Sequence, residues 1–155
     1  MDDRGLLGDA PLGRLSGHCV LVVDDDEEIR TFLATLMTDE GAAALQAADS
    51  DEALATAVRA KPDLITLDLS MPGRDGIETF CDLRENPSTE QIPVCIITGY
   101  PEYRKLIYDR PVVPPEGFIY KPCDPEHVVR TIRRILGLGK RKRARARPPR
   151  VEAEG

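Results

Sequence analysis

The sequence predicts an α/β fold, a doubly wound (βα)5 parallel sheet with strand order 2-1-3-4-5. Five short apolar runs alternate with segments whose apolar residues recur at helical spacing. The chain has 155 residues, of which 41% are hydrophobic and 31% are charged, which suits one domain with a single core. Alternation of this kind favours right-handed crossovers between parallel strands, with helices on both faces of the sheet.

The first strand and the first helix have the clearest pattern. The apolar run Leu21–Val23 leads directly into Asp24 and Asp25. Beyond them, apolar residues recur at spacings of three and four, which places them on one face of a helix that Gly41 can end. The residues on this face are Ile29, Phe32, Leu33, Leu36 and Met37. A second run, Ala42–Gln46, has no chemically active residue at its end.

A second helix, a central strand and a third helix follow. Ser50 is the predicted N-cap of the second helix, which ends before Pro62. The segment Asp63–Leu69 is too continuously apolar for a half-exposed strand, so it predicts a central strand covered on both faces. After a glycine-containing turn, the third helix extends to Asn86-Pro87 with an inner face of Ile77, Phe80, Cys81 and Arg84.

The last part of the domain is rich in proline. Ile92–Thr98 is a second buried strand, and Pro101–Asp109 can form a short helix. Three prolines between residues 111 and 115 then exclude regular structure until the fifth strand, Phe118–Tyr120. Asp124-Pro125 opens the last helix with an N-cap and an N1 proline. Its apolar face consists of Val128, Ile132, Ile135 and Leu136.

Four of the five apolar runs end in residues that can take part in chemistry. These are Asp24 and Asp25 after the first run, Asp68 after the third, Thr98 after the fourth and Lys121 after the fifth. The carboxyl ends of parallel strands share one edge of the sheet, and the switch point of this strand order lies between the strands that carry the aspartates. Because crowded carboxylates need a cation or hydrogen bonds to stay charged, the sequence predicts a divalent cation there.

The two ends of the chain differ in composition from the middle. Residues 1–17 contain four glycines and a proline, and residues 139–155 hold seven lysines and arginines against two glutamates. The C-terminal segment is therefore +5, which leaves −11 for residues 1–138. We expect both ends to be disordered and residues 18–138 to form the domain. Contact with nucleic acid is expected only through the basic tail, because the body is acidic.

Cysteine spacing and hydropathy indicate the cellular compartment of the protein. The four cysteines form no Cys-x-x-Cys pair, which favours reduced thiols over a zinc site or a disulfide framework; they are Cys19, Cys81, Cys95 and Cys123. No apolar stretch approaches the roughly 18 to 20 residues that span a bilayer, and the N-terminus lacks a signal-peptide pattern. We expect a soluble cytoplasmic protein with no membrane partner.

Three segments together resemble a known family. They are VVDDDE (22–27), DLITLDLSMPGRDG (63–76) and FIYKP (118–122), with Thr98 at the end of the fourth strand. In this order they are similar to the receiver domain of two-component response regulators, over about residues 19–138. The resemblance implies a CheY-like, flavodoxin-like version of the predicted fold and a place in a phosphorelay.

The resemblance also implies roles at the strand ends. Asp68 would accept a phosphoryl group from a histidine kinase or a histidine phosphotransfer protein, since an ionised carboxylate can form a labile acyl phosphate. Lys121 would pair with Asp68 and then with a phosphoryl oxygen, and the Lys121-Pro122 bond would be cis. Mg²⁺ (or Mn²⁺) would be held by Asp24, Asp25, Asp68 and the backbone carbonyl of Ser70.

A conformational switch is implied as well. In the family, the residue at the position of Thr98 hydrogen-bonds the phosphoryl group while an aromatic residue, here Phe118, rotates inward. Phe118 has no hydroxyl, so a hydrogen-bonded switch is unavailable, and plain core packing is its alternative role. Ser70 and Tyr100 lie two positions after Asp68 and Thr98, where receivers tune the access of hydrolytic water.

The output of the domain is the least determined part. Residues 108–116 read YDRPVVPPE, which departs from the family's Ala- and Gly-containing segment, so partner choice and dimer geometry do not carry over. The 17 residues after the domain are too few for an effector domain. A single-domain regulator is therefore expected, which acts through an unidentified downstream protein, through its tail or as a homodimer.

Two other functions stay open. The expected protein is a switch that catalyses its own phosphorylation and dephosphorylation and is not a metabolic enzyme. A pseudo-receiver could serve only as an interaction module, although such a module does not need all five strand-end groups. A haloacid-dehalogenase-like phosphatase could use Asp24 and Asp26 as nucleophile and acid, but this alternative leaves Asp68 unexplained.

Overall fold

A computed structural model describes residues 13–69 and 76–138 of the chain. Its five strands form one parallel sheet in the order β3-β2-β4-β5-β6, which confirms the predicted order. The strands are β2 (Cys19–Val23), β3 (Ala43–Ala47), β4 (Leu64–Leu67), β5 (Val94–Thr98) and β6 (Gly117–Tyr120). The helices are α2 (Glu27–Asp39), α3 (Ser50–Ala60), α4 (Gly76–Glu85), α5 (Tyr103–Tyr108) and α6 (Pro125–Ile135). Within the described ranges, no helix has both the length and the apolar character needed to cross a bilayer.

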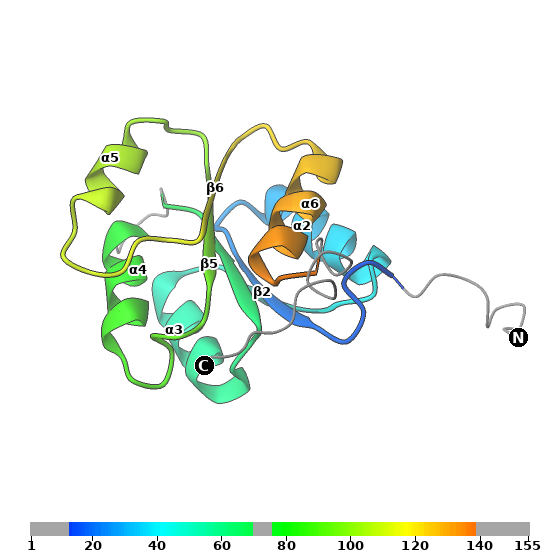
Figure 1. Ribbon diagram of the computed structural model, residues 1–155, viewed down its shortest axis with the longest axis horizontal. Helices are drawn as coiled ribbons and strands as arrows, with labels where there is room; N and C mark the ends of the chain where they lie inside the picture. The colour runs from blue at the N-terminus through cyan, green and yellow to red at the C-terminus, as the bar shows by residue number, and fades with distance from the viewer. Residues whose placement is uncertain (1–12, 70–75, 139–155) are drawn as a thin grey trace, which may run out of the picture.

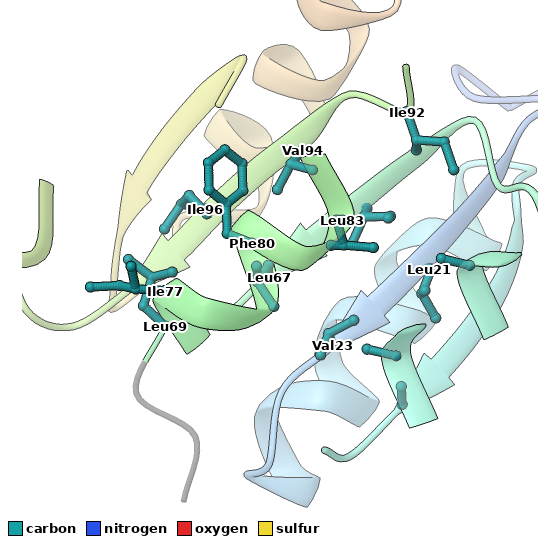
Figure 2. Close-up of a cluster of buried hydrophobic side chains, with 14 of the residues drawn as sticks. Leu21, Val23, Leu67, Leu69, Ile77, Phe80, Leu83, Ile92, Val94 and Ile96 are labelled. Atoms are coloured by element: carbon teal, nitrogen blue, oxygen red, sulfur yellow. The ribbon is translucent and has the colours of Figure 1, made fainter. Parts of the chain in front are cut away.

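Two hydrophobic cores lie on opposite faces of the sheet. Helices α3, α4 and α5 cover one face, and α2 and α6 cover the other (Figure 1). Side chains alternate along β2, so that Leu21 and Val23 belong to the first core whereas Val20 and Val22 belong to the second. Figure 2 shows the first core, in which α4 packs over the sheet. Cover on both faces explains why every residue of β4 and β5 is buried.

The hydrogen bonds of the sheet bring the ends of its strands to one edge. The amide of Asp68, directly after β4, donates to the carbonyl of Val23 in β2 at 3.0 Å. Farther along the same edge, Thr98 of β5 pairs with Tyr120 of β6, and the amide of Lys121 donates to the carbonyl of Thr98 at 2.8 Å. The polar residues after the strands are therefore held by the sheet itself.

Aspartate side chains cap helices α2, α3 and α6, with one difference from the sequence prediction. Asp124 caps α6 and a proline occupies its first turn, as expected. The cap of α3, however, is Asp49, whose carboxylate accepts the amide of Glu52 at 2.8 Å, so the prediction of Ser50 was wrong. Ser50 is buried inside the first turn, and its hydroxyl lies 2.5 Å from that of Thr79 on α4. Its polar group therefore joins two helices.

The N-terminal boundary of the folded region also differs from the prediction. Residues 13–17 were expected to be disordered, yet Leu15 is fully buried in the second core, and its amide donates to the carbonyl of Glu40 at 2.7 Å. The Arg14 guanidinium makes ion pairs with Glu40 at 2.9 Å and with Glu126 at 2.8 Å. One apolar side chain and one bridging cation thus fasten this segment to α2 and α6.

Arg133 of α6 contacts both ends of the described chain. Its guanidinium donates to the carbonyl of Arg14 at 2.5 Å and to the carbonyl of Leu138 at 3.2 Å. The two ends of the folded region therefore meet at the same side of the molecule. Residues 1–12 and 139–155, which include most of the segments expected to be disordered, lie outside the described residues.

Replacing Leu15 with alanine is expected to lower the free energy of unfolding by about 2–5 kcal/mol, the usual cost of a cavity left by a buried leucine. Urea denaturation of the full chain measures this loss. Arg14→Gln is the matched control in the neighbouring position, and a much smaller effect is expected because its ion pairs are exposed to solvent. Equal stability of the Leu15→Ala variant and the wild type would contradict the burial of this segment.

A buried arginine fixes the proline-rich segment before β6. The side chain of Arg84 is only 3% exposed, and its guanidinium lies 4.9 Å from the centre of the Phe80 ring. It donates, at 2.7–3.0 Å, to the carbonyls of Ile92, Val113 and Pro114 and to the carboxylate of Glu116. Glu116 also accepts the amide of Val94 at 2.8 Å. The Arg84 guanidinium therefore supplies donors to carbonyls in a segment whose prolines have no backbone N–H to donate.

Candidate functional site

Three aspartates gather at the edge between β2 and β4. Oxygen atoms of Asp24, Asp25 and Asp68 all lie within 4.8 Å of one another. Asp24 is 1% exposed and Asp68 is 2% exposed, whereas Asp25 is open to solvent. The cluster therefore has two buried carboxylates and one at its mouth, at the switch point that the sequence predicts.

Backbone contacts hold Asp24 in place. Its amide donates to the carbonyl of Ala47 at 3.2 Å, and its Oδ1 accepts the amide of Asp26 at 3.0 Å. Arg30 of α2 donates from its guanidinium to the carbonyl of Asp24 at 2.9 Å and to the side chain of Gln46 at 3.1 Å. Arg30 was absent from the sequence prediction, because nothing in its own helical pattern shows that it reaches back to the preceding strand.

Lys121 bridges the two buried carboxylates. Its Nζ lies 3.6 Å from Oδ2 of Asp68, the expected partner, and nearer still, at 2.9 Å, to Oδ2 of Asp24. The Lys121-Pro122 bond is cis, as expected. Burial alone would lower the pKa of the Lys121 ammonium, but its hydrogen bond to Asp24 and the charge of Asp68 raise that pKa above its usual value. Lys121 therefore stays charged in the cluster.

The environment of Asp24 disfavours an uncompensated negative charge, which a bound cation would stabilise. Burial raises the pKa of its carboxyl, and the hydrogen bonds from Asp26 and Lys121 offset this rise only in part. The cluster offers three carboxylates, which are the hard oxygen ligands that Mg²⁺ prefers. The donor set therefore fits a divalent ion of this kind. Ser70, the fourth expected ligand through its carbonyl, lies outside the described residues.

Gly76 holds the start of α4 against Leu69, the residue after Asp68. The amide of Gly76 donates to the carbonyl of Leu69 at 3.0 Å. A Cβ atom at this position would lie 2.4 Å from Cα of Leu69, so no other residue fits without a shift of the backbone. The first residue of α4 is thus held against the residue after Asp68.

Thr98 and Tyr100 line the next part of the edge. Thr98 is fully buried, and its Oγ1 accepts the amide of Tyr100 at 3.3 Å. Accepting through a lone pair leaves the hydroxyl proton of Thr98 able to donate. The Tyr100 ring is exposed and lies 5.5 Å from the ring of Tyr103. The structure thus brings Thr98 to the same edge as the cluster and leaves Tyr100 at its surface.

Phe118 lies half-buried on β6, at the margin of the first core. The guanidinium of Arg104 on α5 lies 5.3 Å from the centre of its ring and also 5.3 Å from that of Tyr108. Sequence analysis missed Arg104. The spacing of Arg104 and Tyr108 is typical of a contact along a helix, but the contact with Phe118 depends on how α5 packs.

Asp26 takes a structural role. Its carboxylate accepts the amides of Glu28 at 2.9 Å and Ile29 at 3.3 Å, and so caps α2. The phosphatase alternative requires this carboxyl as a catalytic acid next to Asp24. Because Asp26 is directed at the helix, the geometry favours the set of Asp24, Asp25 and Asp68 over that alternative.

Comparisons with known proteins agree with this geometry. The family model of the response regulator receiver domain matches residues 20–133. An uncharacterised 14.6 kDa protein of Leptolyngbya boryana is 35% identical over 73% of this chain and 86% of its own length. The phosphate regulon transcriptional regulatory protein PhoB of Pseudomonas aeruginosa is 33% identical over 77% of this chain, which spans about half (52%) of that protein.

A solved structure gives the same result. The chemotaxis response regulator CheY4 of Vibrio cholerae superimposes with a TM-score of 0.66 and 29% identity, covering 76% of this chain and 98% of that one. The strand order, the acidic edge and the match to the family model lead to one assignment. The chain belongs to the response regulator receiver domain family.

Proposed function

We propose that Asp68 accepts a phosphoryl group from a histidine kinase or a histidine phosphotransfer protein in a reaction that depends on Mg²⁺ or Mn²⁺. The phosphorylated domain then signals in the cytoplasm through a downstream protein. The observation that carries this proposal is the cluster of Asp24, Asp25 and Asp68 with Lys121 at the switch-point edge. Membership of the family supports it.

In the transfer step, a carboxylate oxygen of Asp68 forms a bond to phosphorus while the bond from phosphorus to the donor's histidine nitrogen breaks, and the histidine leaves neutral after taking up a proton. Asp24, Asp25, Asp68 and the backbone carbonyl of Ser70 would hold the metal ion. When bound, this ion offsets the charge of the phosphoryl oxygens. Lys121 is within 3.6 Å of Asp68, close enough to contact a phosphoryl oxygen after a small movement.

The proposal includes the conformational switch that the resemblance implies. Thr98 donates a hydrogen bond from its hydroxyl to a phosphoryl oxygen, and Phe118 moves inward, as the resemblance implies. Ser70 and Tyr100 lie two positions after Asp68 and Thr98 in the sequence, where the resemblance implies control of the access of water to the acyl phosphate, so their size would set its lifetime. The exposed ring of Tyr100 at the mouth of the edge supports this role.

Intact-protein mass spectrometry tests the proposal. The full chain, incubated with acetyl phosphate and Mg²⁺, is expected to gain the mass of one phosphoryl group. The gain should disappear when a chelator replaces Mg²⁺, and hydroxylamine should remove it because acyl phosphates are labile to this nucleophile. A folded sample that gains no phosphoryl group under these conditions would overturn the proposal.

Metal binding gives a separate prediction. Mg²⁺ at about ten times its Kd is expected to stabilise the wild type by about 1.4 kcal/mol, because it binds only the folded cluster. Asp25→Asn should lose most of this stabilisation, since the variant removes one of the three carboxylates. Thermal unfolding with and without Mg²⁺ measures the effect, and Asp51→Asn on α3 is the control for an acidic residue outside the cluster. An equal response of Asp25→Asn and the control would contradict the site.

A further inference from the structure

Phe118 has a neighbour that no assigned role explains. Arg104 is an exposed residue of α5, and its guanidinium lies over two aromatic rings, 5.3 Å from the centre of Phe118 and 5.3 Å from that of Tyr108. The Phe118 ring also lies 5.3 Å from the ring of Tyr120. The half-buried position of Phe118 is therefore bounded by a cation and an aromatic ring.

The contact with Arg104 has an energetic consequence, because Phe118 carries no hydroxyl. No hydrogen bond from this side chain can favour one of its positions over another. A guanidinium over the face of a neutral aromatic ring is attracted to the negative electrostatic potential of that face, and Arg is well suited to this contact because its planar group stacks. The cation over the ring thus provides the specific polar interaction that this aromatic side chain can make.

We propose that Arg104 is a positioning residue, which holds Phe118 in its half-buried position and so opposes the inward movement that accompanies phosphorylation. The inference rests on the proposed function, in which Phe118 moves when Asp68 is phosphorylated. Tyr108 keeps Arg104 in place from the same helix, four residues along. Inward movement of Phe118 gives up the contact with Arg104, so a ligand that favours the inward state must overcome it.

Beryllofluoride with Mg²⁺ serves as the phosphoryl analogue in the test. Removing a contact of this strength should make the analogue bind about two- to fivefold more tightly. The full chain contains three phenylalanines. Selective isotope labelling of phenylalanine therefore gives few ring signals to follow by NMR while beryllofluoride is titrated. Arg104→Gln is the main variant, and Arg104→Lys should fall between it and the wild type because it keeps the charge without the planar group.

Lys105→Gln is the matched control. It removes the same charge from the next position of α5, where Lys105 pairs with Asp109 and contacts neither ring of the Arg104 site. Its affinity for the analogue should equal that of the wild type. In a Phe118→Leu background, Arg104→Gln should have no effect, since the ring that it acts through is absent.

The possible outcomes separate the two ideas. If the wild type binds no beryllofluoride, the proposed function fails and the role of Arg104 fails with it. If the wild type binds but Arg104→Gln binds with the affinity of Lys105→Gln or more weakly, the role of Arg104 alone is overturned. An equal effect of Arg104→Gln with and without Phe118 would also overturn it, because the contribution would then act through another group.

Discussion

Replacing Asp68 with asparagine is expected to abolish the uptake of a phosphoryl group. The amide has no negative charge and is too weak a nucleophile to form an acyl phosphate. The fold should survive, because asparagine has the shape of aspartate and its side-chain oxygen can still accept a hydrogen bond from Lys121. The loss would therefore report chemistry rather than unfolding, in a site where Asp68 is 2% exposed.

The measurement compares intact masses after incubation with acetyl phosphate and Mg²⁺. Wild type and Asp51→Asn, whose substituted carboxylate lies on α3, should both gain one phosphoryl group, and Asp68→Asn should gain none. Circular dichroism establishes that all three are folded. A gain in Asp68→Asn equal to that of the wild type would move the acceptor to another carboxylate of the cluster, Asp24 or Asp25, which lie within the same 4.8 Å.

Replacing Arg84 with methionine is expected to lower the free energy of unfolding by about 2–4 kcal/mol. Methionine can keep the contact with the Phe80 ring but donates no hydrogen bond. The buried carbonyl of Ile92 would lose its donor outright, and the carbonyls of Val113 and Pro114 would lose theirs with partial access to water. The ion pair with Glu116 adds little to the estimate, because that carboxylate is 38% exposed.

Urea denaturation measures this loss, and Glu116→Gln separates the charge from the hydrogen bonds. Glutamine still offers a side-chain oxygen to Arg84 and to the amide of Val94, so its cost should stay below about 1 kcal/mol. If Arg84→Met costs no more than Glu116→Gln, the carbonyl contacts do not fix the proline-rich segment.

Local patterns predicted most of the fold and the composition of the site. The continuous apolar runs at Leu64–Leu67 and Val94–Thr98 are central strands, because helices cover both faces of the sheet there. The polar residue after each run lies at the shared edge, since parallel strands end together. Asp124 caps α6 through contacts within a few residues, which a sequence shows directly.

Contacts between distant residues were beyond such patterns. Leu15 is buried because it completes a core formed by α2 and α6, and a glycine-rich segment gives no local sign of this. Lys121 lies nearer to Asp24 than to Asp68, a difference that depends on side-chain packing and not on strand order. Arg84 has a helical spacing that predicts burial, but its hydrogen bonds to Val113, Pro114 and Glu116 reach across 29 to 32 positions of sequence.

The meeting of Arg14 and Leu138 at Arg133 makes the folded region between them suitable for circular permutation. Because one guanidinium contacts the carbonyls of both Arg14 and Leu138, a connecting segment of a few residues can span the gap between them. The order of the strands along the polypeptide chain could then be changed while the sheet and its acidic edge stay the same. Reporter proteins joined directly to residue 13 or to Leu138 would likewise emerge beside α6.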